Sequence, residues 1–239
     1  MIESIQVIGA RGRVGSTVSS RLAERGVRLD AADRDLVLLC VPDRAIAEVA
    51  AELPLGPWVA HVSGATPLSA LAPHMRRFSV HPLLSITKAR GPEQLDGGWA
   101  AVTAESTDAR AAGFWLAETL GLRPFGLADE RRAAYHAAAA IASNYLVTLR
   151  KVAGSLAESA GVPSETLDPL MRSVIDSGFE LTGPIARGDW GTVDRHLDAI
   201  REQRPELEEL YLALARVTAV LAGRELPGDA VSPGVGGRR

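Results

Sequence analysis

Ile5-Gln-Val-Ile-Gly9-Ala-Arg-Gly12-Arg-Val-Gly15 is the stretch that decides the fold of this 239-residue chain. An apolar run of four residues is followed by three closely spaced glycines and then by a helix-like run that reaches Gly26. Apolar runs of this length that stop at glycine are typical of buried strands. The pattern therefore predicts a strand, a glycine turn and a helix, in that order.

A turn of this kind suits a pyrophosphate group. Backbone N–H groups and the positive end of a helix dipole attract anions, and glycines let the backbone come close to the ligand. We expect Gly9, Gly12, Arg13, Val14 and Gly15 to bind the pyrophosphate of a dinucleotide.

The glycine spacing departs from the usual fingerprint. It is G-x-x-G-x-x-G here, whereas G-x-G-x-x-G is common, so the loop holds one extra residue, either Ala10 or Arg11. The side chains of Arg11 and Arg13 could approach a phosphate, or they could be solvated loop arginines.

The part of the chain that normally follows this motif is short. Asp30 stands where an acidic residue would hold the adenosine ribose, but the next apolar run, Leu36–Val41, begins only a few residues later. Neighbouring parallel strands need a crossover of about a dozen residues. Either Val27–Asp30 is a loop or an edge segment, or the adenosine side of the pocket is truncated. Asp30 could also be an ordinary surface residue.

Composition excludes several classes of protein. A net charge of −3 leaves no basic surface for nucleic acid, and no apolar run approaches the roughly 18 residues of a membrane span. The single cysteine, Cys40, rules out an internal disulfide and is expected to be a small core residue. We see no signal peptide and expect a cytoplasmic protein with no membrane partner.

The pattern of apolar residues changes near residue 128. Before it, short apolar runs alternate with helical patterns, which predicts an α/β domain with a parallel sheet over residues 1–127. After it, residues 128–226 read as helices only, and the glycine-rich tail 227–239 is expected to be disordered. The expected strands are Ile5–Ile8, Leu36–Val41, Trp58–Val62, Arg77–Val80, Trp99–Val102 and Leu122–Gly126. The expected helices are Ser16–Arg25, Asp43–Leu53, Asp108–Leu120, Asp129–Ser159, Ser164–Leu181, Trp190–Glu202 and Pro205–Leu221.

Polar residues follow three successive strands. Asp43 comes after Leu36–Val41, Ser63 after Trp58–Val62, and His81 after Arg77–Val80. The carboxyl ends of parallel strands lie at one edge of a sheet, where such folds bind their ligands. The sequence therefore predicts a site there.

Each of these residues has a functional and a structural interpretation. His81 could exchange a proton with a substrate oxygen, or it could be held structurally beside Pro82. Ser63 could bind the substrate or the nicotinamide amide, or it could simply shape a turn. Asp43 is expected to cap a helix, and Val41, Pro42 and Asp43 to line the cofactor.

Polar residues also interrupt the alanine-rich helix Asp129–Ser159. His136 and Ser143 share a face, and Asn144 lies about 80° further round at 100° per residue. We take His136 and Asn144 as candidate site residues, with an interhelical hydrogen bond as the alternative. The other histidines, His61, His74 and His196, show no metal-ligand spacing, so no metal is predicted.

Several motifs together resemble one family. They are VIGARGRVG (7–15), LVLLCVPD (36–43), HVSGA (61–65), SVHPL (79–83), YHAAA (135–139), ASN (142–144) and LTGPIARGD (181–189). The chain resembles Rossmann-like proteins with a DUF2520 C-terminal domain, relatives of the 6-phosphogluconate, β-hydroxyacid and ketopantoate reductase superfamily. The His-Pro pair also resembles prephenate dehydrogenases, in which such a histidine contacts the substrate hydroxyl.

The resemblance implies an NAD- or NADP-dependent oxidoreductase acting on a small keto or hydroxy acid between the two domains. His81 would be the acid/base, with Ser63 and Asn144 orienting the substrate. It also implies a homodimer formed through the helical domain. The chain departs from the family in its shortened second strand and helix, and only Lys151 is available as a match for the superfamily's catalytic lysine. Two alternatives stay open: a Rossmann-like module that binds a metabolite or protein without redox chemistry, and an enzyme with a smaller cofactor.

Overall fold

The computed structural model describes residues 2–29, 33–225 and 227. The chain divides into two compact units, Met1–Ser143 and Asn144–Arg239. Asp30 and the tail from residue 228 onward lie outside the described residues, so the expectations for them stay predictions. The domain boundary expected near residue 128 also stays a prediction.

The first unit contains one mixed sheet of seven strands in the order β2-β1-β3-β4-β5-β6-β7. All neighbouring pairs are parallel except β5 and β6. The strands are β1 (Ser4–Ile8), β2 (Arg28–Leu29), β3 (Leu36–Leu39), β4 (Trp58–His61), β5 (Arg77–Leu83), β6 (Trp99–Ala104) and β7 (Arg123–Gly126). The Rossmann-like α/β fold expected from the sequence is confirmed.

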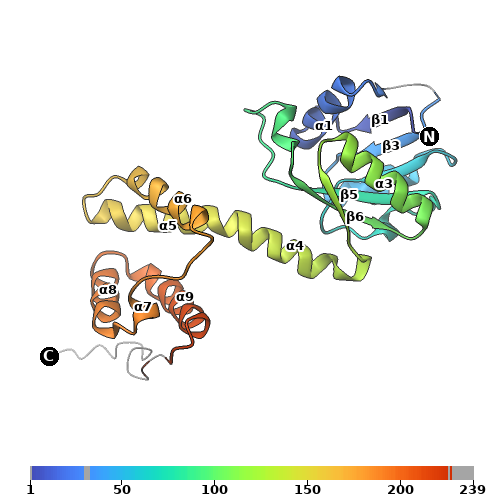
Figure 1. Ribbon diagram of the computed structural model, residues 1–239. Coiled ribbons are helices and arrows are strands. Elements are labelled where there is room, and N and C mark those ends of the chain that lie inside the picture. Colours follow the sequence, from blue (N-terminus) through green and yellow to red (C-terminus); the bar gives the residue numbers. More distant parts are fainter. Residues whose placement is uncertain (1, 30–32, 226, 228–239) are drawn as a thin grey trace. The chain divides into compact units, whose positions relative to one another are not determined.

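Helices cover both faces of this sheet. On one face lie α1 (Arg13–Glu24) and α3 (Thr107–Thr119) (Figure 1). Their side chains Val18, Leu22 and Leu116 pack against apolar side chains of the strands. On the other, α2 (Ile46–Ala51) and the 3₁₀ turn η2 (Leu68–Leu71) cover β3 and β4. Strands covered on both faces have apolar side chains in succession, which explains why Leu36–Leu39 are all buried.

Strand β5 differs from the expectation. It was expected to end at Val80, but it continues to Leu83, so His81 and Pro82 lie within the strand. The extension is stabilised by antiparallel pairing with β6, which places His81 opposite Ala101. A proline has no N–H to donate, but β4 pairs with β5 only as far as Ser79, so at Pro82 the strand is paired on one side alone.

The region after α1 is as short as the sequence indicated. β2 holds two residues, which pair with Ser4 and Ile5 at the start of β1. In the described residues between Leu29 and Leu36 there is no helix. The edge-segment interpretation of Val27–Asp30 is therefore confirmed for Arg28 and Leu29.

The second unit is helical. The chain enters it through a continuous helical stretch made of η4 (Asp129–Arg131), α4 (Arg132–Ala140), the π-helical turn η5 (Ile141–Tyr145) and α5 (Leu146–Ser159). Further along lie η6 (Ser164–Thr166), α6 (Leu167–Asp176), α7 (Pro184–Arg187), α8 (Trp190–Gln203), η7 (Pro205–Leu207) and α9 (Glu208–Leu221). The expected helix to Leu181 ends earlier, at Asp176, because Gly178 and Phe179 adopt positive φ angles.

A small core joins α7, α8 and α9 through Ile185, Val193, Leu197, Ala215 and Ala219. Apolar side chains on α6 and α9 remain exposed, among them Leu170 and Val217. The homodimer stays a prediction, and these are surfaces it could use. None of the described helices has the length and apolar character that a membrane crossing requires.

Candidate active site

The glycine turn lies at the carboxyl-terminal edge of the sheet, between β1 and α1. The N–H of Gly12 donates to the carbonyl of Gly9 over 2.9 Å, and Gly12 is the N-cap of α1. This closed turn accommodates the extra residue of the G-x-x-G-x-x-G spacing. The first N–H groups of α1, from Arg13 onward, have no partner inside the helix and can bind an anion.

Two of the three glycines are required by close packing. A Cβ on Gly9, whose φ is +89°, would lie 2.4 Å from the carbonyl oxygen of Cys40. A Cβ on Gly15 would lie 2.1 Å from the carbonyl oxygen of Gly9. The turn therefore packs directly against the end of β3 and against its own helix. Burial raises the pKa of the Cys40 thiol to about 12, in keeping with the expected core role.

The loop after β4 is organised by Ser63. Its hydroxyl donates to Asp43 Oδ2 over 2.8 Å and accepts the N–H groups of Ala65 and Thr66 at 3.2 and 3.0 Å. The structure thus supports the turn interpretation of Ser63, while its predicted contact with substrate is untested. The expected helix cap at Asp43 is wrong: Pro42 is the N-cap, and the Asp43 carboxylate binds Ser63 instead.

Two histidines converge over Gly64. A Cβ at Gly64 would lie 2.8 Å from His136 Nδ1 and 2.9 Å from His81 Nε2, so only glycine leaves room for both rings. The ring centroids of the two histidines are 6.1 Å apart. His81 Nδ1 also forms a hydrogen bond of 2.7 Å with the hydroxyl of Tyr135. The structure thus brings together residues from the loop after β4, from β5 and from α4.

Burial sets the protonation states of His81 and Tyr135. Desolvation, followed by the charges of His136 and Arg132, lowers the pKa of His81 to about 4. Burial also raises the pKa of Tyr135 to about 12. At neutral pH the imidazole is therefore uncharged and the phenol keeps its proton.

A buried arginine, Arg132, connects the start of α4 to the loop after β4 and to β5. Arg132 is 3% exposed, and its guanidinium donates to Asp129 Oδ1 over 2.5 Å and to the carbonyl of Ser63 over 3.1 Å. It also donates to the hydroxyl of Ser79 on β5. Asp129 in turn accepts the N–H of Leu68. Arg132 therefore ties the start of α4 to β4 and β5.

His61 is fully buried at the end of β4. Its Nδ1 accepts the N–H of Ser63 over 3.2 Å, while its Nε2 is buried without a partner among the described residues. Desolvation, followed by the charge of Arg132, lowers its pKa to about 4. The sequence analysis treated His61 as an isolated histidine. It did not predict that the ring is buried and hydrogen-bonded to the backbone of Ser63.

We expect the free energy of unfolding of the first unit to fall as the pH is lowered from 6.5 to about 4. His61 and His81 both have pKa values of about 4 in the folded protein, whereas the ordinary pKa of histidine in an unfolded chain is 6.5. In that window the unfolded chain binds protons that the folded chain does not, so stability rises with pH, by at most about 1.4 kcal/mol per pH unit for each histidine. Urea unfolding of the wild type and of His61→Asn at several pH values measures this. The variant should show the shallower slope, and equal slopes would contradict the assignment.

The other predicted residues fall in different places. Gly9, Gly12 and Arg13 are exposed at the turn, Val14 is half-buried, and Val41, Pro42 and Asp43 follow β3 at the same edge. Asn144 is exposed in the π-helical turn and belongs to the second unit. Sequence reasoning missed Arg132, Asp129 and Tyr135. The i, i+3 spacing of Asp129 and Arg132 was the signal for that pair.

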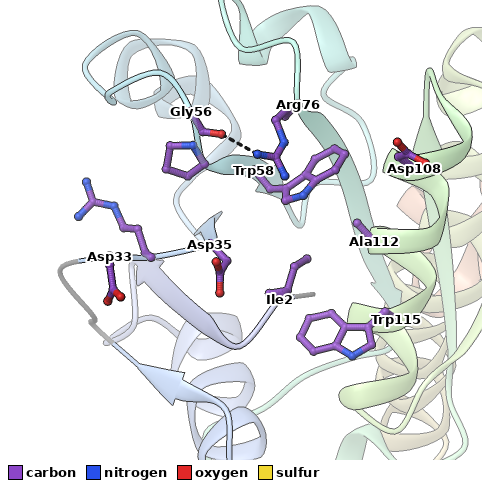
Figure 2. A pocket seen from close by; sticks show the side chains of 11 residues that line it. Ile2, Asp33, Asp35, Gly56, Trp58, Arg76, Asp108, Ala112 and Trp115 are labelled. Carbon is purple, nitrogen blue, oxygen red and sulfur yellow. Dashed lines mark hydrogen bonds between the residues drawn. The ribbon is translucent and has the colours of Figure 1, made fainter.

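A separate cavity of about 560 Å³ opens at the opposite edge of the sheet. Asp35, Trp58 and Arg76, which line it, lie at the starts of β3, β4 and β5 or directly before them. Figure 2 shows Trp58 and Trp115 on either side of Ile2, with Arg76 donating to the carbonyl of Gly56 over 3.1 Å. The glycine turn and His81 lie at the carboxyl-terminal edge, so this cavity is not part of their site. In the part of the chain that the structure describes, no group of His, Cys, Asp and Glu could hold a metal ion.

Comparisons with known proteins agree on the fold. The sequence model of one family, "Domain of unknown function (DUF2520)", matches residues 99–218. No curated protein matches the chain.

Solved structures resemble the chain over most of its length. A proposed NADP oxidoreductase of Bacteroides fragilis is 21% identical with a TM-score of 0.75, covering 92% of this chain and 98% of that one. A protein of Thermotoga maritima is 26% identical with a TM-score of 0.72, covering 92% and 100%. A semialdehyde dehydrogenase NAD-binding protein of Cupriavidus necator, solved with calcium and NAD, is 18% identical with a TM-score of 0.60, covering 89% and 99%.

Proposed function

The chain belongs to the DUF2520 family, and from that premise we propose that it is an NAD(P)-dependent oxidoreductase acting at the carboxyl-terminal edge of its sheet. One observation carries the proposal: the glycine turn after β1 lies at the same edge of the sheet as His81 on β5, which is hydrogen-bonded to Tyr135 on α4. Two similar structures, one named as an NADP oxidoreductase and one as an NAD-binding protein, support the same role.

The residues of the turn fit a nicotinamide cofactor. Gly9, Gly12 and Gly15 keep side chains out of the turn, and the N–H groups from Arg13 and Val14 begin α1. Three strand spacings, roughly 14 Å, separate β1 from β5. From the glycine turn the nicotinamide would extend toward β5, past Val41–Asp43 and Ser63. When bound, NAD(P) exchanges a hydride with the substrate carbon.

His81 is the proposed acid/base. In the tautomer with its proton on Nδ1, that nitrogen donates to the Tyr135 oxygen, and Nε2 is left to accept a proton from a substrate hydroxyl. In the reductive direction, the same nitrogen returns the proton to a carbonyl oxygen. His136, whose Nδ1 approaches the same point over Gly64, would bind the substrate oxygen.

The substrate we propose is a small keto or hydroxy acid. The Ser63 hydroxyl already donates to Asp43 and accepts two N–H groups, so Ser63 would orient the substrate through the loop that it holds. Arg132 is not available for the substrate's carboxylate, since Asp129, Ser63 and Ser79 already occupy the guanidinium.

Binding of nicotinamide nucleotides tests the proposal first. Titration with NADPH and NADH, followed by dihydronicotinamide fluorescence, should give saturable binding at micromolar concentrations. No binding of either nucleotide up to millimolar concentrations would contradict the proposal. It would favour the alternative, a Rossmann-like module that binds a metabolite or a protein partner without redox chemistry.

His81→Gln tests the proton transfer. Once a screen of 2-hydroxy and 2-keto acids has identified a substrate, the variant should lose about 10²- to 10⁴-fold in kcat, because the proton has no acceptor. Its affinity for the nucleotide should change by less than about threefold, since three strand spacings separate His81 from the glycine turn. His196→Gln, an exposed position on α8, is the matched control and should keep full activity. Unchanged kcat in His81→Gln would rule out this residue as the acid/base.

A further inference from the structure

Strand β2 and the described residues from Asp33 to Asp35 lie at the amino-terminal end of the sheet, away from the edge where the adenosine half of a cofactor would bind. Leu29, the last residue of β2, and Leu36, the first of β3, both pair with Ile5. β1 continues for three residues beyond Ile5, to Ile8. At about 3.3 Å per residue, β2 therefore ends roughly 10 Å short of the edge that carries the glycine turn.

The residues after β2 are anchored at the amino-terminal edge. The carbonyl of Asp33 accepts the hydroxyl of Ser4, and the carboxylate of Asp35 accepts the N–H groups of Glu3 and Ser4 at 2.9 and 3.0 Å. These hydrogen bonds lower the pKa of Asp35, so its charge holds this segment beside the start of β1. Figure 2 shows Asp33 and Asp35 around the cavity at that edge.

The described residues on both sides of this connection lie away from the glycine turn: Leu29 pairs with Ile5, and the carbonyl of Asp33 accepts the hydroxyl of Ser4. In complete folds of this type, the residue that binds the adenosine ribose or its 2′-phosphate comes from the carboxyl end of the second strand.

The two arginines on and after β2, Arg28 and Arg34, lie at the amino-terminal edge of the sheet. Arg28 on β2 lies 3.9 Å from Glu3 at the amino-terminal edge, and Arg34 lines the cavity there. Neither is placed to bind a 2′-phosphate at the carboxyl-terminal edge.

We propose that the site recognises the nicotinamide mononucleotide half of the cofactor and takes little affinity from the adenosine half. This inference rests on the proposed function. The glycine turn and the start of α1 would bind the phosphate of that half, and the loops after β3 and β4 would hold its ribose and nicotinamide. The protein then does not distinguish NADPH from NADH, and reduced nicotinamide mononucleotide binds nearly as well as either.

Titration of the full chain with NADH, NADPH and reduced nicotinamide mononucleotide tests this, with dihydronicotinamide fluorescence and calorimetry as readouts. We expect three dissociation constants within about tenfold of one another. A preference of more than about tenfold for either dinucleotide over the mononucleotide, or between the dinucleotides, would overturn the inference and leave the oxidoreductase proposal standing. Absence of binding by all three would overturn both.

Variants of Gly12 locate the binding. Gly12→Asp places a negative charge at the N-terminus of α1 and should weaken all three ligands alike, by about 100-fold. Gly12→Ala is the matched control: its Cβ lies 3.2 Å from the Gly9 carbonyl oxygen, so it adds the same crowding without the charge and should weaken binding much less. If Gly12→Asp, shown to be folded by circular dichroism, bound the mononucleotide as well as wild type, the assignment to this turn would be wrong.

Discussion

Gly15→Ala is expected to destabilise the first unit by about 1–3 kcal/mol and to abolish nucleotide binding. The new Cβ would lie 2.1 Å from the carbonyl oxygen of Gly9, 2.7 Å from its carbonyl carbon and 3.0 Å from the Cα of Ala10. All three atoms belong to the backbone, so no side chain can move aside. The start of α1 must shift away from the glycine turn, and the N–H groups that would bind phosphate shift with it.

Urea unfolding and the nucleotide titration together measure this effect. Gly191→Ala in α8 is the matched control, because the space around its Cβ is open apart from the flexible end of Arg195, 3.8 Å away. It should be neutral or slightly stabilising, as alanine favours helices over glycine. A Gly15→Ala protein with wild-type stability and binding would show that the turn is not packed as described.

Arg132→Met is expected to destabilise the first unit by about 3–5 kcal/mol, the usual result of removing one partner from a buried ion pair. The change leaves the Ser63 carbonyl and the Ser79 hydroxyl without their donor and removes the cation bound to Asp129. It also removes a positive charge that lowers the pKa of His81, so that pKa should rise. Urea unfolding measures the first effect, and NMR titration of the histidine ring protons measures the second.

The neighbouring residue provides the control for Arg132. Arg131 is exposed, and Arg131→Met should change stability by no more than about 0.5 kcal/mol and leave the titration of His81 unaltered. Arg132→Lys keeps the charge but loses the planar fork, so it should recover the pKa of His81 better than the stability. If Arg132→Met lost no more stability than Arg131→Met, the guanidinium would not be the link between α4, β4 and β5.

Local pattern was enough for most of the first unit. Apolar runs bounded by glycine and polar residues predict strands wherever both faces of a sheet are covered, so β1, β3, β4, β6 and β7 were found within one or two residues. The shortness of the region after α1 was also evident, because chain length alone limits what can fit between two strands.

Long-range pairing explains where the expectations differed. The extension of β5 through Pro82 depends on antiparallel hydrogen bonds to β6, which runs in the opposite direction to the parallel strands before it. The two residues of β2 are a strand only because Ser4 and Ile5 lie beside them. Neither feature leaves a periodicity in its own segment.

By itself, the sequence determined the strand, glycine turn and helix at the start of the chain and the meeting of Asp43, Ser63 and His81 at one edge of the sheet. These follow from spacing and from the direction of parallel strands. Only the tertiary structure decided that Ser63 binds Asp43, that Tyr135 is the partner of His81, and that Arg132 is buried and donates to the carbonyl of Ser63. Those contacts join residues 20, 54 and up to 69 positions apart, and a hydrogen bond across such a separation depends on how the elements pack, which no local pattern records.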